Sequence, residues 1–354
     1  MSATLCQMLG ITLPVIQAPM AGWQNSALTL AVSSTGALGS LPCAMLTPEQ
    51  ISAELPKLRD AGRPYNLNFF AHRPPAPDTE REARWRAALA PYALELGVDL
   101  AAPSHNASRT PFNAALAALI EPFRPPVVSF HFGLPAPELV ARVKSWGARV
   151  LSSATSVAEG LWLQERGVDA VIAQGAEAGG HRGHFLGDDL DVATQAGSFA
   201  LLPQLVHALH VPVVACGGIA DAAGVAAAQA LGAAAVQVGT AYLLCHEATT
   251  SAVHRAALKS PDAARTALTN LFSGRPARGI VNRLMRELGP LNTAAPAFPG
   301  AATAIAPLRA AAEALGRDDF SPLWSGQNAS GCREMPAAQL TLLLAAGWRL
   351  GDPS

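Results

Sequence analysis

The stretch PVVACGGIAD at residues 212–221 joins an apolar run, a pair of glycines and the start of a helix, in that order. An alanine-rich segment with helical character, residues 222–232, separates it from a second apolar run, AVQV, at residues 235–238. Both runs are apolar at nearly every position, as expected of parallel strands that are covered on both faces. The distance between the runs fits one strand plus one helix, so this part of the chain predicts a β/α unit.

The same unit recurs along most of the chain, with a similar spacing in several places. Its apolar runs are VIQA from 15, ALGS from 37, NLNF from 66, VVSF from 127, RVLS from 149, AVIA from 170, PVVA from 212 and AVQV from 235. These eight units predict an α/β protein of the (β/α)8 class, a TIM barrel. The segment GVDLAA at 97–102 is a candidate ninth strand, and a doubly wound sheet is the alternative architecture.

The strand pattern stops near residue 245, which predicts a smaller C-terminal helical domain. Residues 247–270 and 304–316 have helical patterns, separated by the loop TAAPAFPGAAT, and PAAQLTLLLAAGW at 336–348 has the length of one more helix. We expect this last helix to pack back on the barrel. The predicted division is a barrel over residues 1–245 plus 330–354, and a helical lid or substrate domain over residues 246–329.

The bulk composition favours a compact globular protein and excludes several other classes. Only 14% of residues are charged, the formal net charge is −1 at pH 7, and Lys and Arg are scattered, so a nucleic-acid partner is not expected. The apolar stretches are too short to span a membrane, and no basic residue precedes Lys57 as a secretory signal would require. The five cysteines have neither CxxC nor metal-ligand spacing, which predicts a cytoplasmic protein without a metal site.

Glycines follow the last two predicted barrel strands. Gly217 and Gly218 come after the run that begins at 212, and Gly239 and Thr240 come after the run that begins at 235. The loops after strands seven and eight of a TIM barrel often bind phosphate, because glycine lets backbone N–H groups approach the anion closely. These glycines therefore predict a phosphate-bearing ligand. The alternative is that they only form tight turns.

A flexible segment with two histidines, QGAEAGGHRGHF at 174–185, begins at the end of the sixth predicted strand. Its glycines allow the segment to fold over a ligand and to carry a side chain to it. His181 and His184 are candidates for proton transfer or for contact with an anion, because imidazole can act near neutral pH. The alternative for both is a histidine of an ordinary surface loop.

Polar and flexible residues also follow other predicted strands. QAPMAG at 17–22 forms a turn after the first strand, and the period of two places Asn66 and Asn68 on one face of the third. These amides either enter the barrel mouth or only cap turns, and His131 either lines that mouth or is a structural histidine. Cys216 has no obvious activating group nearby in the sequence, so we interpret it as a packing residue.

The motifs QAPMAG, NLNFF, QGAEAGGHRG, CGGIAD and QVGTAY, in this order, resemble those of the nitronate monooxygenases, formerly called 2-nitropropane dioxygenases. Members of this family are FMN-dependent TIM barrels. SGRPARG at 273–279, WSGQ at 324–327 and REMPAAQL at 333–340 are similar to its C-terminal segments. The resemblance runs from about residue 14 to the end of the chain, and AEAGGHRG is its most specific motif.

The resemblance implies FMN as the cofactor and assigns roles to particular residues. The implied phosphate contacts, together with Gly217 from the argument above, are Gly218, Gln237, Val238, Gly239 and Thr240. The implied flavin contacts are Met20, Asn68, Gln174, Gly179, Gly180 and Gln327. His181 matches the family's active-site histidine, and His131, His184 and Phe298 are the candidates for the substrate pocket.

The implied reaction is the oxidation of an alkyl nitronate, or of a nitroalkane, by O2 to a carbonyl compound and nitrite. The partners would be this small substrate and O2, with the protein acting as a monomer or homodimer. One departure is that Phe298 and alanines stand in a segment, 297–312, where better-known bacterial members tend to have tyrosine and polar residues. The alternatives are an FMN-dependent NAD(P)H enoyl reductase and a flavin-free phosphate-binding barrel, which would be an isomerase or lyase or a ligand-binding protein.

Overall fold

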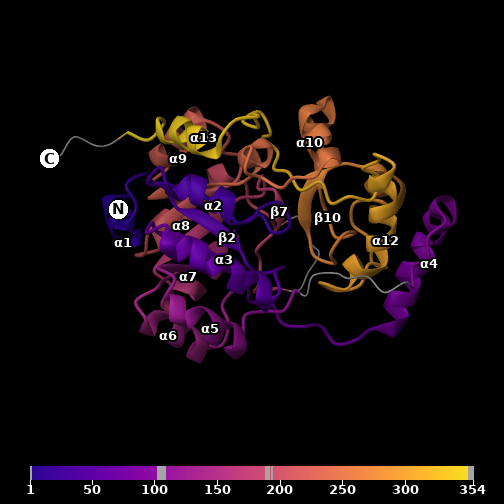
Figure 1. Cartoon of the computed structure of the whole chain (residues 1–354), viewed down its shortest axis with the longest axis horizontal. Coiled ribbons are helices and arrows are strands. Elements are labelled where there is room, and N and C mark those ends of the chain that lie inside the picture. The colour runs from indigo at the N-terminus through magenta and orange to yellow at the C-terminus, as the bar shows by residue number, and fades with distance from the viewer. Residues whose placement is uncertain (1, 102–108, 188–191, 193, 350–354) are drawn as a thin grey trace.

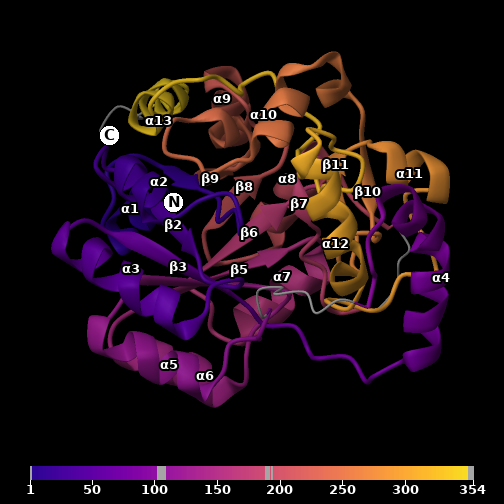
Figure 2. The same ribbon diagram turned by 45° about the vertical axis from the view of Figure 1, so that its right-hand side comes forward.

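The chain folds into a barrel with a smaller second layer against one end (Figures 1 and 2). The computed structural model describes residues 2–101, 109–187, 192 and 194–349. Its barrel strands are β1 (Val15–Gln17), β2 (Gly39–Pro42), β3 (Tyr65–Phe70), β4 (Val127–His131), β5 (Arg149–Ala154), β6 (Ala170–Gln174), β8 (Val213–Cys216) and β9 (Ala235–Val238). Each of them coincides with one of the eight apolar runs, so the prediction of a (β/α)8 barrel is confirmed.

All neighbouring barrel strands are parallel, in the order β1-β9-β8-β6-β5-β4-β3-β2. A parallel bridge between Ile16 and Leu38 joins the two ends of this order, so the sheet closes on itself. Closure places the carboxyl ends of all eight strands around one mouth, where a TIM barrel carries its active site.

Helices surround the barrel and cover its outer face. In chain order, α2 (Ser26–Ser33), α3 (Pro48–Asp60), α4 (Thr79–Leu96), α5 (Ala114–Ile120), α6 (Pro137–Ser145), α7 (Val157–Glu165), α8 (Ser198–Ala208) and α9 (Ala222–Ala230) lie between the strands, and α1 (Ser2–Leu9) precedes β1. Of these helices, α4 packs in the second layer and not on the barrel. Side-chain caps begin several of them; Thr47 and Gln50, for example, form a capping box on α3. The core is the apolar side chains between sheet and helices, such as Leu28 and Val236, which are fully buried.

The candidate ninth strand at 97–102 is wrong over its described residues, 97–101, which form no strand. Instead Gly97 ends α4 with a left-handed backbone, φ +64°, and residue 102 lies outside the described part. The apolar residues Val98 and Leu100 pack against a second hydrophobic cluster, away from the barrel. A short apolar run at a helix end has the same local pattern as a buried strand.

The segment after residue 245 contains strands as well as helices. It holds α10 (Ala252–Lys259), β10 (Thr266–Thr269), β11 (Ala277–Ile280), α11 (Arg283–Leu288) and α12 (Ala301–Ala314), followed by α13 (Ala337–Ala345). The prediction of one helix over 247–270 is therefore wrong, because the chain leaves α10 through a 3-10 turn and enters β10. The helix predicted at 304–316 is confirmed as α12. The C-terminal helix is also confirmed, since α13 packs on α2 and α9.

The second layer has its own core, and α4 contributes to it. Trp85 and Leu89 of α4 are fully buried against Leu308 of α12. The indole Nε1 of Trp85 donates to the carbonyl of Ala301 at 3.2 Å. A helix that precedes β4 in the chain thus completes the layer formed mainly by residues after 245 (Figure 2).

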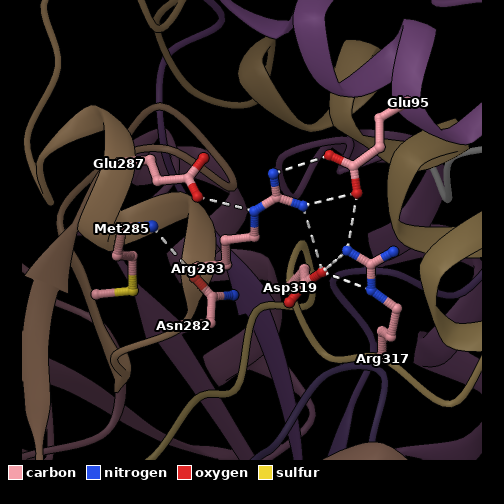
Figure 3. Close-up of polar contacts among 7 residues, drawn as sticks. All are labelled: Glu95, Asn282, Arg283, Met285, Glu287, Arg317 and Asp319. Atoms are coloured by element: carbon pink, nitrogen blue, oxygen red, sulfur yellow. Dashed lines mark hydrogen bonds and ion pairs between the residues drawn. The ribbon is translucent and has the colours of Figure 1, made fainter.

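A network of ion pairs fastens α4 to the rest of this layer (Figure 3). Arg283 donates to the two carboxylate oxygens of Glu95 at 2.9 and 2.8 Å, and its Nε donates to Glu287 at 2.8 Å. Arg317 donates to Glu95 as well, at 3.0 Å. These two guanidinium groups lower the pKa of Glu95 to about 2.

Replacing Glu95 with glutamine should lower the melting temperature near neutral pH. A carboxyl group whose pKa is lowered on folding adds stability above its ordinary pKa, and that stability is lost as the pH falls through the folded value. The difference in melting temperature between wild type and Glu95→Gln should therefore shrink as the pH falls from 4.5 towards 2. Calorimetry over this range measures the two melting temperatures. A difference that stays constant down to pH 2 would contradict the lowered pKa of Glu95.

Two further findings concern the described residues. None of the helices there has both the length and the apolar character needed to cross a bilayer. That part of the chain also brings together no cluster of three or more His, Cys, Asp or Glu side chains suited to a metal ion.

Candidate functional site

A large cavity opens at the carboxyl ends of the barrel strands. Barrel residues such as Asn68, Gln174 and Gln237 form its floor and walls, and Phe272 and Trp324 of the second layer also line it. Thirteen of the residues that the sequence assigns to the cofactor or substrate site line this one cavity: Met20, Asn68, His131, Gln174, Gly179, Gly180, His181, Gly217, Gly218, Gln237, Val238, Gly239 and Thr240.

Gln327, His184 and Phe298 are not among the residues that line the cavity. Gln327 is exposed, and its backbone N–H donates to the carbonyl of Glu177 at 2.9 Å; its neighbours Gly326 and Asn328 line the cavity in its place. The carbonyl of His184 accepts a hydrogen bond from Arg275.

Two glycines at the end of β8 and two residues at the end of β9 form one end of the cavity. Gly217 and Gly218 have φ of +121° and +74°, a backbone conformation that side chains disfavour. No described residue accepts a hydrogen bond from the backbone N–H of Gly218, Gly239 or Thr240. Since backbone N–H groups rarely go without a partner, these donors are suited to an anionic group of a ligand.

The loop after β6 closes over this end and is held on both sides. The carboxylate of Glu177 accepts hydrogen bonds from the backbone N–H and the hydroxyl of Ser198, at 2.8 and 2.9 Å. On the other side, Gly179 lies against the backbone of Ser325 and Gly326. The side chain of Asn328 donates to the carbonyl of Gly218 at 3.0 Å. The second layer thereby fixes the loop and the glycine turn together.

His181 is placed by a short strand pairing. With Gly180 it forms β7, which pairs with β11 in an antiparallel three-stranded sheet. Its carbonyl accepts hydrogen bonds from Gln174 Nε2 at 2.9 Å and His131 Nε2 at 3.1 Å. Its ring Nε2 lies 2.8 Å from the hydroxyl of Ser273. Backbone and ring are therefore fixed by separate partners.

Aromatic rings surround the His181 imidazole. The centroids of Phe70, Phe132, Phe298 and Trp324 lie 6.1, 5.9, 5.4 and 5.6 Å from that of His181. Burial lowers the pKa of His181 well below its ordinary value, and nearby positive charge adds to the effect. The imidazole is therefore neutral near pH 7.

His131 has a structural role beside its place in the cavity wall. Because a carbonyl oxygen only accepts, Nε2 of His131 carries the proton in its bond to His181. Its Nδ1 then accepts from the hydroxyl of Ser153, at 3.0 Å. Burial lowers its pKa to about 4. His131 thus acts mainly by holding the backbone of His181 in place.

The amides of β3 occupy different depths. Asn66 is buried and donates to the hydroxyls of Ser40 and Ser129, at 3.0 and 2.9 Å, whereas Asn68 donates to Ser129 and also lines the cavity.

Cys216 lines the cavity too, but burial raises the pKa of its thiol to about 11. A protonated thiol is a weak nucleophile, in agreement with a packing role.

Sequence reasoning missed several residues that surround His181. Phe70, Arg109 and Trp324 line the cavity, Phe132 packs on the imidazole, and Ser273 bonds to it. Most of them come from segments distant in the sequence from 174–185. The SGRPARG motif, which begins at Ser273, was the available signal for that residue.

The comparison with known protein families decides how this cavity is interpreted. A family model described as nitronate monooxygenase matches residues 2–346. The chain belongs to the nitronate monooxygenase family. A nitronate monooxygenase from Pseudomonas aeruginosa is 42% identical over 344 residues, which cover 96% of this chain and 97% of that protein. A nitronate monooxygenase from Paraburkholderia phytofirmans is 41% identical, and the match covers 96% of this chain and 93% of that protein.

Solved structures agree with this assignment. A nitroalkane oxidase from Streptomyces ansochromogenes is 38% identical, with a TM-score of 0.88. The match covers 98% of this chain and 97% of the chain of that oxidase. FabK from Thermotoga maritima has a TM-score of 0.69 at 24% identity, and the match covers 97% of this chain and 95% of the FabK chain. At this identity the similarity shows the fold alone. As a member of the nitronate monooxygenase family, the protein is an oxidoreductase that acts on a small molecule and uses a flavin cofactor.

The cavity of this nitronate monooxygenase family member fits a flavin nucleotide. The unused N–H groups of Gly218, Gly239 and Thr240 suit a phosphate, which is the anionic part of such a cofactor. Beside His181, a Cβ atom at Gly180 would meet no atom of the described residues within 4 Å, so this position borders open space in the cavity.

Replacing Ser273 with alanine should lower kcat by up to about tenfold, the loss expected for one hydrogen bond, with little change in KM or flavin content. The hydroxyl fixes the orientation of the His181 ring, so its loss leaves the imidazole in place but less well aligned. Steady-state kinetics measures this effect. Ser273→Thr, which keeps the hydroxyl, should restore most of kcat; a threonine variant as slow as the alanine one would contradict a role for this hydrogen bond.

Proposed function

We propose that the protein binds FMN and catalyses the oxidation of alkyl nitronates, and of nitroalkanes that it deprotonates, by O2 to a carbonyl compound and nitrite. The observation that carries the proposal is the neutral His181, held by Ser273 and Gln174 at a cavity whose other end offers unused backbone donors. When bound, the flavin supplies the redox chemistry of the reaction. FMN is favoured over a larger nucleotide by the family resemblance.

The residues of the barrel would bind and orient this cofactor. Gly218, Gly239 and Thr240 would hold its phosphate through backbone N–H groups. Asn68 and Gln174 would provide polar contacts to its ring, and both side chains are already oriented by hydrogen bonds, to Ser129 and to Gly183. We further propose that residues 246–329 form a substrate domain, which α4 supports from behind, and that the barrel over 1–245 and 330–354 is the FMN-binding domain.

His181 would remove the α-proton when the substrate is a neutral nitroalkane. The hydroxyl of Ser273 donates to the carbonyl of Arg275 at 3.3 Å, so its oxygen can accept Nε2–H of His181 at 2.8 Å. This arrangement leaves Nδ1 unprotonated and able to take a proton. The aromatic rings around the imidazole would limit the access of water to that step.

The test is a visible spectrum of the purified protein followed by assays with ethyl nitronate, nitroethane and NADH. We expect flavin absorbance, consumption of O2 and release of nitrite with ethyl nitronate, and no bleaching when NADH is added without air. Bleaching by NADH would favour the enoyl reductase alternative, and a colourless protein that takes up no FMN would favour a flavin-free barrel. We propose a cytoplasmic enzyme that is a monomer or homodimer, which size-exclusion chromatography can test.

A further inference from the structure

Two arginines line the cavity, and neither belongs to the motifs that resemble a flavin site. Arg109 lies between α4 and α5, and Arg309 lies on α12. A guanidinium group keeps its charge at any pH at which the protein is folded. The cavity therefore has two fixed positive charges, while both of its histidines, His131 and His181, are neutral near pH 7.

The two arginines differ in what balances their charge. Arg309 forms an ion pair with Glu313, with Nε 2.7 Å from a carboxylate oxygen. Arg109 makes no hydrogen bond or ion pair with any described residue, and its Nε is buried. Of the described residues that line the cavity, Glu177 alone is acidic, and its carboxylate is bound to Ser198. A partly buried cation without a counter-charge favours an anionic ligand.

Arg109 lies close to the reacting end of the cavity. Its guanidinium carbon is 5.9 Å from the ring centroid of Phe298, and the His181 ring is 5.4 Å from the same centroid. Among the charges near His181, that of Arg109 contributes most to lowering the pKa of the imidazole. An anion bound by Arg109 would therefore lie within reach of the region around His181.

We propose that Arg109 binds the negatively charged oxygens of the substrate, with Arg309 adding to the attraction, and that it makes the cavity selective for nitronate anions over neutral nitroalkanes. This inference rests on the proposed function for its substrate. The planar fork of the guanidinium matches the two oxygens of a nitronate group, as it matches those of a carboxylate. A neutral nitroalkane carries no net charge and gains much less from this contact.

The test compares Arg109→Gln with the wild-type holoenzyme. We expect the KM for ethyl nitronate to rise at least about tenfold, as for a hydrogen bond to a charged group, while the KM for nitroethane changes less than about twofold. Nitrate, a planar anion, serves as a probe that needs no turnover. Its binding, followed by the fluorescence of tryptophan because Trp324 lines the cavity, should weaken by a similar factor in the variant.

Arg84→Gln is the matched control, because it removes an arginine from the exposed face of α4 and should leave nitrate affinity unchanged. Should Arg109→Gln fail to fold, Arg109→Lys tests the same point: lysine cannot form the fork, so nitrate should bind several-fold more weakly. Nitrate affinity equal to wild type in either folded variant would overturn the proposal. If the wild type oxidised neither substrate, the proposed function would fail, and the nitrate titration would still decide the role of Arg109.

Discussion

Replacing His181 with asparagine is expected to lower turnover of nitroethane by about 10²- to 10⁴-fold, the range for loss of a general base, while FMN stays bound. Asparagine is close to histidine in size and keeps a polar group, but it cannot take a proton. The flavin contacts predicted for the neighbouring loop use backbone atoms, which the substitution leaves in place. Steady-state assays of nitrite release, with flavin content measured on the same preparation, test this expectation.

The same variant should lose far less activity with preformed ethyl nitronate, because that substrate has already lost its α-proton. His207→Asn is the matched control, since this histidine is exposed at the end of α8. If His181→Asn turned over nitroethane at the wild-type rate, His181 would have no part in the reaction. If both substrates slowed equally, the imidazole would act in a step other than proton removal.

The barrel could be predicted from the sequence because its evidence is local. Each strand is a short apolar run followed by a turn and a helix, and the unit repeats eight times. Barrel topology alone then places the residues at the carboxyl ends of the strands around one mouth, so that Asn68, Gln174, Gly218 and Thr240 are expected to lie together. The cavity collects these residues as expected.

The surroundings of His181 could not be predicted because they depend on contacts between distant segments. β7 pairs with β11, so His181 lies opposite Ala277, and the hydroxyl that binds its ring comes from Ser273. The strands β10 and β11 are short and follow a helix, so their apolar pattern is weak. The packing of α4 against α12 likewise cannot be predicted from the hydrophobic pattern of either segment, because each of them predicts only an amphipathic helix.

The arginine pair shows why charge is difficult to interpret from sequence. Arg109 and Arg309 stand 200 positions apart and have ordinary neighbours in the chain. Only the fold shows that both reach one cavity and that Arg109 has no carboxylate of a described residue beside it. Both line the cavity, and Arg109 lies over the ring of Phe298. Substrate selectivity is therefore the property for which the structure adds most to the sequence.

Replacing Gly179 with alanine should weaken FMN binding at least about tenfold, because the new methyl group cannot be accommodated without moving backbone. A Cβ atom at this position would lie 2.5 Å from the backbone nitrogen of Gly326 and 2.7 Å from the carbonyl carbon of Ser325. Since neither atom belongs to a flexible side chain, the loop at 175–181 must shift away from the second layer. That shift displaces both the predicted flavin contacts and His181.

Titration of the apoprotein with FMN, followed by quenching of flavin fluorescence, measures this loss, and kcat/KM should fall with it. Gly187→Ala is the matched control, because a Cβ atom there meets no atom of the described residues within 4 Å, and Gly187 lies in the same connection between β6 and α8. Overpacking of this kind costs about 1–3 kcal/mol, so the melting temperature of the barrel should fall only slightly if the strain is confined to the loop. An unchanged FMN affinity in Gly179→Ala would mean that the loop does not form part of the cofactor site.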